Sequence, residues 1–169
     1  MLITGEQLKR IAQQMSEDTL HVGTSSIDVR LGFEFYIGGK DAFITRTGDY
    51  HGFEHKSYVM GQRILFKPGY LYIAHSLEYV RMPNDVGAIL LMRSTAGRRG
   101  LDHLHAGWLE PGWEGQITFE LSPIVPTEFE VGERIAQLVL VRAEEESQYA
   151  GHYQGQKGAT LAKALLRAP

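Results

Sequence analysis

Cysteine is absent from this 169-residue chain. Its absence excludes a disulfide framework, a thiolate nucleophile and every zinc site that uses thiolate ligands. The formal net charge is only −3, so the chain as a whole does not attract nucleic acid or an anionic membrane. No apolar stretch approaches membrane-spanning length, and the N-terminal residues show no signal-peptide pattern. We therefore expect a soluble cytoplasmic protein that binds neither nucleic acid nor membranes.

Helix signals are also scarce, and the N-terminal segment carries the clearest set. Thr4 and Gln7 have the spacing of a capping box, in which each side chain bonds the backbone N–H of the other residue. Leu8, Ile11 and Met15 then recur at the spacing of one helix face. The sequence predicts one short helix here, which ends before residue 23.

Most of the remaining chain has the pattern of short strands separated by glycine, proline or polar turns. Residues 38–55 lack clear periodicity and are predicted to form a long loop or a meandering hairpin. Many short strands at this spacing predict a mainly β domain, either a barrel or a two-sheet sandwich. The strand candidates are Ser26–Leu31, Glu34–Ile37, Arg63–Phe66, Leu71–Leu77, Val86–Met92, Gly115–Leu121 and Ile135–Val141.

The composition changes near residue 144. An acidic turn at residues 144–147 precedes a stretch rich in glycine and glutamine at 150–159, and Leu161, Leu165 and Leu166 are predicted to form a weak terminal helix. We assign residues 1–143 to the β domain and residues 144–169 to a C-terminal segment of the same domain. Such a tail is either disordered or a lid that becomes ordered over a ligand.

Residues 92–101 concentrate phosphate-binding chemistry. Guanidinium groups, hydroxyls and accessible backbone amides together form a socket for a polyphosphate. The alternative is a solvated basic turn between two strands. The polar members are Arg93, Ser94, Thr95, Arg98 and Arg99, with Gly97 and Gly100 between and after them.

Glu120 lies on the polar face of an alternating strand, together with Thr118. An isolated glutamate at such a position is usually just a solvated side chain. Here the preceding turn can bring a second carboxylate, Glu110, to the same side. Because phosphates repel a carboxylate, Glu120 suits proton transfer at the uncharged end of a phosphorylated ligand.

Other polar candidates have structural explanations. His103 and His105 could form half of a metal site, but we favour histidines in a pocket wall. Asp28 is expected to make a structural hydrogen bond or an ion pair with Arg30. The two tryptophans are expected to pack in the core or at a subunit interface.

Four motifs, in order, resemble those of the dCTP deaminases, which share a superfamily with the trimeric dUTPases. They are residues 24–32, 93–98, 106–121 and 153–158. The resemblance implies a distorted β-barrel of jelly-roll type, assembled as a homotrimer with active sites between subunits. It further implies hydrolytic deamination of dCTP to dUTP and ammonia, and admits dTTP as a feedback ligand. Mg²⁺ would be bound through the triphosphate, and the missing cysteines agree with a reaction that uses no catalytic zinc.

The resemblance also assigns roles to individual residues. Glu120 would be the catalytic residue that takes a proton from the water attacking C4 of cytosine and passes protons to N3 and the departing amine. Thr118 and Phe119 would contact the base edge through backbone groups. The full set of nucleotide-binding residues implied is Arg93, Ser94, Thr95, Ala96, Gly97, Arg98, Ala106, Glu110, Thr118, Phe119, Tyr149, His152 and Gln156.

Four departures from the family pattern bear on specificity. Glu110 replaces an aspartate, His105 a threonine and His152 a lysine, and the segment between Gly100 and Ala106 is one residue short. They leave three alternatives open: a bifunctional enzyme that converts dCTP to dUMP and pyrophosphate, a non-catalytic nucleotide-binding regulator, and an enzyme for a modified cytosine nucleotide.

Overall fold

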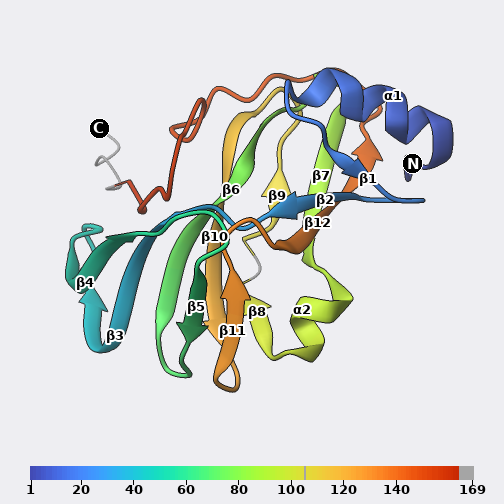
Figure 1. The fold of residues 1–169 in the computed structure, drawn as a ribbon. Coiled ribbons are helices and arrows are strands. Elements are labelled where there is room, and N and C mark those ends of the chain that lie inside the picture. The colour runs from blue at the N-terminus through green and yellow to red at the C-terminus, as the bar shows by residue number, and fades with distance from the viewer. Residues whose placement is uncertain (105, 164–169) are drawn as a thin grey trace.

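Strands dominate the computed structural model, which describes residues 1–104 and 106–163 (Figure 1). Helix α1 (Gly5–Met15) comes first and a short helix α2 (Ser94–Arg98) follows β7. The mainly β class with a short N-terminal helix is thus confirmed. The strands are β1 (His21–Val22), β2 (Ile27–Arg30), β3 (Glu34–Ile44), β4 (Tyr50–Ser57), β5 (Arg63–Phe66), β6 (Leu71–Arg81), β7 (Val86–Met92), β8 (Leu101–His103), β9 (Trp108–Leu109), β10 (Glu114–Pro123), β11 (Thr127–Glu130) and β12 (Arg134–Arg142).

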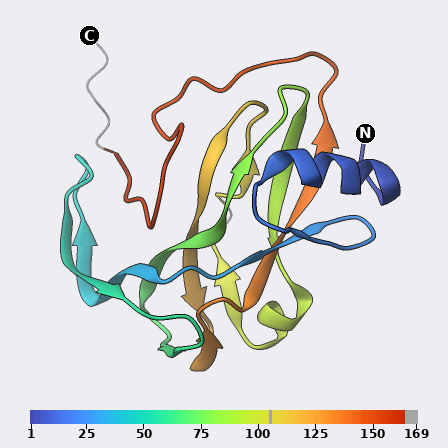
Figure 2. The same ribbon diagram turned by 45° about the horizontal axis from the view of Figure 1, so that its top comes forward.

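Two five-stranded antiparallel sheets form the body of the molecule. One has the strand order β1-β2-β12-β7-β9 and the other β4-β3-β6-β10-β8, while β11 and β5 form a separate pair. One hydrophobic cluster contains residues of both large sheets, including Phe35 and Phe119 from one and Leu138 from the other. Because each large sheet contributes an apolar face, the sheets enclose a common core (Figure 2).

Helix α1 is held by its buried face. Leu8 and Met15 are fully buried, and each such side chain contributes about 1.5–3 kcal/mol. The expected capping box is wrong: Thr4 occupies the cap position but makes no side-chain cap hydrogen bond. Instead, the N–H of Gly5 donates to the carbonyl of Thr24 at 3.1 Å, which anchors the helix start to a distant loop. No helix within the described ranges is long and apolar enough to cross a membrane.

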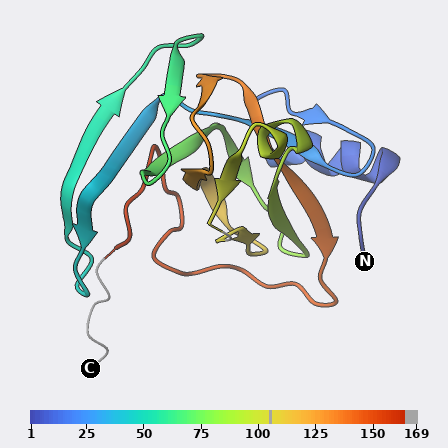
Figure 3. The ribbon, with the colours of Figure 1, turned by 90° about the horizontal axis from the view of Figure 1, so that it is seen from below.

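All seven strand candidates are confirmed. Residues 38–55 form the β3–β4 hairpin, so the hairpin was the correct alternative, with an irregular register between Gly38 and Phe43. Its tip projects from the body (Figure 3), and Phe43 and Ile44 are exposed there. A strand that buries neither face has no reason to alternate apolar and polar residues, which explains the missing periodicity.

The C-terminal segment runs back over the sheet that contains β10. Gln156 forms an isolated parallel bridge with Gly115, and its carbonyl accepts from the N–H of Gln116 at 2.9 Å. The segment therefore behaves as an ordered cover, which favours a lid over a disordered tail. Leu161 is not helical, and the rest of the expected terminal helix lies outside the described residues.

Candidate active site

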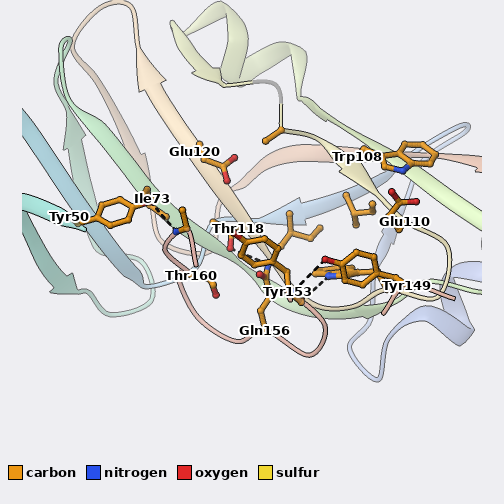
Figure 4. Close-up of a pocket in the computed structure, with 15 residues that line it drawn as sticks. Tyr50, Ile73, Trp108, Glu110, Thr118, Glu120, Tyr149, Tyr153, Gln156 and Thr160 are labelled. Atoms are coloured by element: carbon orange, nitrogen blue, oxygen red, sulfur yellow. Dashed lines mark hydrogen bonds between the residues drawn. The ribbon is translucent and has the colours of Figure 1, made fainter. Parts of the chain in front are cut away.

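A cavity of about 370 Å³ lies between β10, the turn before it and the C-terminal segment (Figure 4). Its volume is within the range of small-molecule sites. Its described lining consists of Tyr50, Ile73, Ala106, Trp108, Leu109, Glu110, Trp113, Ile117, Thr118, Glu120, Tyr149, Tyr153, Gln156, Thr160 and Ala162. Four separate parts of the sequence therefore meet around one cavity: residue 50, residue 73, residues 106–120 and residues 149–162.

Six of the sequence-predicted site residues line this cavity. They are Ala106, Glu110, Thr118, Glu120, Tyr149 and Gln156. The turn does bring Glu110 to the same hollow as Glu120, as its position before β10 predicted. Phe119 is fully buried in the core, so any role in binding would fall to its backbone.

The C-terminal segment is fixed to β10 through Gln156. Its side-chain amide donates to the carbonyl of Gln116 at 2.9 Å and to the hydroxyl of Thr118 at 3.2 Å. Two residues on, the N–H of Gly158 donates to the side chain of Gln116 at 2.7 Å. These bonds hold the Gln156 side chain against Thr118, and both residues line the cavity (Figure 4).

Aromatic side chains form another wall. The indole N–H of Trp113 donates to the carbonyl of Tyr153 at 3.1 Å, and the backbone N–H of Tyr149 donates to the carbonyl of Pro111 at 3.0 Å. Trp113 is 7% exposed and packs in the core as expected, whereas Trp108 is 52% exposed. The wall thus offers flat apolar surface with few charges.

A register shift between β6 and β10 lies beside this wall, between Gln116 and Thr118. At the shift, the N–H of Ile117 donates to the hydroxyl of Ser76 at 2.8 Å in place of a strand carbonyl. Such irregularities redirect side chains and are common next to active sites. Here the shift lies two to four residues before Glu120.

Glu120 has a buried partner that sequence reasoning did not identify. Its Oε2 atom lies 3.0 Å from Nε2 of His103. Both atoms are buried, and neither has a well-aligned hydrogen bond to any described residue. We expected His103 in a pocket wall, but it is absent from the described lining and contacts the carboxylate instead. His103 lies opposite Leu121, next to Glu120 along β10, in the pairing of β8 with β10, and no pattern in the sequence indicates this contact.

The half metal site considered for His103 and His105 stays untested by the structure. No group of three histidine, aspartate or glutamate side chains placed to hold a metal ion occurs within residues 1–104 and 106–163. His105 lies outside the described residues.

The basic segment 93–98 lies elsewhere, because it contributes nothing to the described lining of the cavity. Arg93 is bound by Asp28, with 3.2 Å between Nε and Oδ2. The same oxygen of Asp28 lies 3.2 Å from Arg134. The expected pair of Asp28 with Arg30 is therefore wrong. Arg30 instead binds Glu78, a carboxylate only 2% exposed on β6, which needs a nearby cation more than a surface residue does.

The rest of this segment faces outward. Ser94, Thr95, Gly97 and Arg98 are exposed, and Ala96 is buried against the core. Arg99 has structural partners: it pairs with Glu133 and stacks 3.8 Å from the ring centre of Phe129. Within the described chain, Arg98 has no ion-pair partner. The outward groups are thus free to bind an anion, but not one that sits in this chain's own cavity.

His152 is the other predicted residue outside the site. It is exposed and does not appear in the described lining, although the neighbouring Tyr153 does. Among the described residues that line the cavity there is no arginine or lysine. The cavity combines two carboxylates, an amide, hydroxyls and aromatic rings, which suits an uncharged polar ring and a proton transfer to it.

Known proteins share these features. A family model described as dCTP deaminase-like matches residues 2–143. The dUMP-forming dCTP deaminase of Sulfurihydrogenibium sp. (strain YO3AOP1) is 35% identical over 155 residues, which cover 88% of this chain and 86% of that protein. The dCTP deaminase of Pyrobaculum arsenaticum is 31% identical, with 98% of both chains covered.

The fold also matches a solved structure, that of 2'-deoxycytidine 5'-triphosphate deaminase from Agrobacterium tumefaciens. The TM-score is 0.66 at 20% identity, and the match covers 84% of this chain but 47% of that one. The chain thus spans about half the length of that protein, and this likeness concerns the fold. The family model and the two relatives lead to one conclusion: the chain belongs to the dCTP deaminase-like family.

Proposed function

We propose that this protein deaminates dCTP hydrolytically to dUTP and ammonia. The observation that carries the proposal is Glu120, which lines an aromatic, cation-poor cavity together with Thr118 and Gln156. Family membership supplies the class of substrate, and this cavity supplies a place for its uncharged base.

The reaction needs a group that moves protons. Glu120 takes a proton from water as the water oxygen bonds to C4 of cytosine, and transfers it to N3. It then takes the proton of the new C4 hydroxyl and gives it to the exocyclic amine. The C4–N bond breaks, ammonia leaves and C4 becomes a carbonyl, so that dCTP and water yield dUTP and ammonia. A positioned general base contributes about 10²–10⁴-fold to such a rate.

The triphosphate requires cations, and no arginine or lysine lines the cavity among the described residues. We infer that the segment 93–98 of a second copy supplies them in a homotrimer, because this chain's own segment is largely exposed and does not line its cavity. Mg²⁺ would enter with the triphosphate, whose oxygens are the ligands it prefers. The side chains of segment 93–98 fit that arrangement, since they are arginines and hydroxyls that bind phosphate and include no carboxylate.

A second candidate is the coupled enzyme that continues from dUTP to dUMP and pyrophosphate. It is favoured by Glu110, which lines the same cavity as Glu120 and offers a second carboxylate to activate water. Several relatives bear the name dUMP-forming, among them those from Sulfurihydrogenibium sp. and Aquifex aeolicus (37% identical over 149 residues).

The deciding experiment is a product analysis of the purified protein with dCTP and Mg²⁺. Ammonia with dUTP is the expected result, and ammonia with dUMP and pyrophosphate would select the coupled enzyme. A parallel incubation with dUTP tests by itself the conversion of dUTP to dUMP and pyrophosphate, the step suggested by Glu110. If no ammonia appears, the proposal is wrong. The next measurements would then be deamination of 5-substituted cytosine nucleotides and nucleotide binding without turnover.

A further inference from the structure

The contact between His103 and Glu120 has an unusual setting. His103 is 4% exposed, and its Nε2 atom and Oε2 of Glu120 are buried and lie 3.0 Å apart. The Glu120 side chain as a whole is 29% exposed, so its exposed part must be other than Oε2. The carboxylate therefore has Oε2 enclosed against an imidazole, while other parts of the Glu120 side chain line the cavity.

This arrangement selects one histidine tautomer. If Nε2 lacked a proton, its lone pair would face the lone pairs of a carboxylate oxygen, and both groups would be buried without a donor. With a proton on Nε2, the imidazole could donate to Oε2 across the 3.0 Å that separates the two atoms, once the ring and carboxylate turn into line, and would satisfy both. An unsatisfied buried polar group is costly, and more so when it is charged. The pair therefore favours a His103 ring that carries a proton on Nε2.

We propose that His103 is a positioning residue for Glu120, an inference that rests on the function proposed above. By occupying Oε2, it leaves Oε1 as the oxygen that takes the proton from water. By holding one end of the carboxylate, it also fixes the direction of the other. Since a misplacement of about 1 Å can cost about 100-fold in rate, this contact affects turnover although His103 does not touch the nucleotide.

Two substitutions separate positioning from simple packing. His103→Leu keeps an apolar body but removes the donor, and His103→Gln keeps an N–H donor at comparable reach. We expect kcat to fall about 10–100-fold in the leucine variant, the range found when a supporting contact to a reacting group is lost, with KM for dCTP changed less than about threefold. The glutamine variant should recover most of kcat. Equal loss in both variants, or wild-type kcat in the leucine variant, would overturn the inference.

A matched control is His75→Gln. His75 is also a buried histidine, but its ring bonds the carbonyl of Ser76 and the N–H of Glu34. This variant should lose stability while its folded fraction keeps the wild-type kcat.

A second measurement does not depend on activity or on folding of the leucine variant. The ¹⁵N NMR signals of the His103 ring in the wild-type protein should show a protonated Nε2 that is protected from exchange, and Glu120→Ala should shift them. A ring protonated only on Nδ1 would overturn the positioning role. A wild-type protein with this NMR signature but no ammonia release would instead identify the proposed function as the part that is wrong.

Discussion

The cavity and the basic segment 93–98 have opposite chemistry. The cavity is enclosed by β10, aromatic rings and the C-terminal segment, and its charged lining residues, within the described chain, are Glu110 and Glu120. The basic segment is an exposed turn of helix with two hydroxyls and the outward Arg98. The cavity suits a flat neutral base, and the segment suits a polyphosphate.

If the proposed function holds, one copy of the chain contains both halves of a nucleotide site without joining them. Even Arg93, the first cation of the segment, is already paired with Asp28. Under that proposal each copy carries two incomplete surfaces, and a complete site would need the cavity of one copy beside the segment of another. The predictions below test first the role of the cavity in catalysis, and then whether the cavity of one copy and the segment of another form one site.

The largest effect should come from Glu120→Gln. The amide keeps the shape of the side chain but cannot accept the proton from water, so kcat should fall about 10²–10⁴-fold, while the dissociation constant for dCTP changes little. Ammonia release and calorimetric binding measure the two quantities. Glu114→Gln is the matched control, because Glu114 begins the same strand but pairs with Arg81 outside the cavity. Deamination at the wild-type rate in Glu120→Gln would contradict the role of the cavity.

Complementation between two variants tests whether the cavity of one copy and the segment 93–98 of another form one site. Glu120→Gln lacks the base, and Arg98→Ala lacks an outward cation, so each protein alone should be nearly inactive at low dCTP. If each site takes Glu120 from one copy and Arg98 from the next, randomly mixed trimers at equal amounts contain about a quarter of intact sites. Co-expressed subunits with two tags should therefore recover about a quarter of the wild-type activity. No recovery in verified mixed oligomers would place both residues in one copy.

Sequence patterns predicted most of the fold because each strand of the body has a buried face. β10 alternates over its whole length and was found directly. The tip of the β3–β4 hairpin has no buried face, and its strands were left ambiguous. The capping box at Thr4 was wrong because a tertiary bond from Gly5 to the carbonyl of Thr24 anchors the helix start, and no local pattern encodes that partner.

The site was predictable where one strand or turn carries it, as for Glu110, Thr118 and Glu120. The contact of His103 with Glu120 was missed because it depends on which strands pair. The partner of Asp28 was wrong for the same reason, since Arg93 and Arg134 reach it from other elements. Spacing along a chain reports on neighbours in one element, whereas ion pairs between elements depend on the register of the sheets.

A smaller effect should come from removing the hydrogen bond between Glu34 on β3 and the C-terminal segment. The carboxylate of Glu34 on β3 accepts from the N–H of Ala159 at 3.0 Å and lies 2.8 Å from Nε2 of His55. Glu34→Ala should loosen the C-terminal segment, which would raise KM for dCTP about tenfold or less, with a smaller change in kcat, since a hydrogen bond to a charged group contributes about 1.5–3 kcal/mol and its loss here is shared with water. Limited proteolysis near residue 159 should also become faster.

Glu54→Gln is the control for this link, because Glu54 pairs with Lys56 on the neighbouring strand β4 and is largely exposed. It should leave both KM and the proteolysis rate unchanged. An unchanged KM in Glu34→Ala would show that Gln156 and its bonds to β10 hold the cover by themselves.

The smallest expected effect concerns the pH dependence of the stability of the fold, through the buried His75. Burial lowers the pKa of His75 below its ordinary value, against a smaller opposing effect of its bond to the Ser76 carbonyl. The ring nitrogens agree with a neutral ring, because Nδ1 donates to that carbonyl at 2.7 Å and Nε2 accepts from the N–H of Glu34 at 3.3 Å. The unfolded chain takes up a proton near pH 6.5 and the folded chain only at lower pH. Stability is therefore retained above about pH 6.5 and lost as the pH falls below it, by at most about 1.4 kcal/mol per pH unit for one proton.

Urea unfolding from pH 7.5 to 5, at one fixed protein concentration, measures this loss. His75→Gln should be less stable at pH 7.5 because its packing is poorer, but its stability should fall less steeply with acid, since glutamine takes up no proton in either state. The difference between the two unfolding free energies should therefore narrow toward pH 5. If the unfolding free energies of the two proteins fall in parallel as the pH is lowered, His75 is protonated in the folded protein at no cost. The loss of stability in acid would then arise at another group.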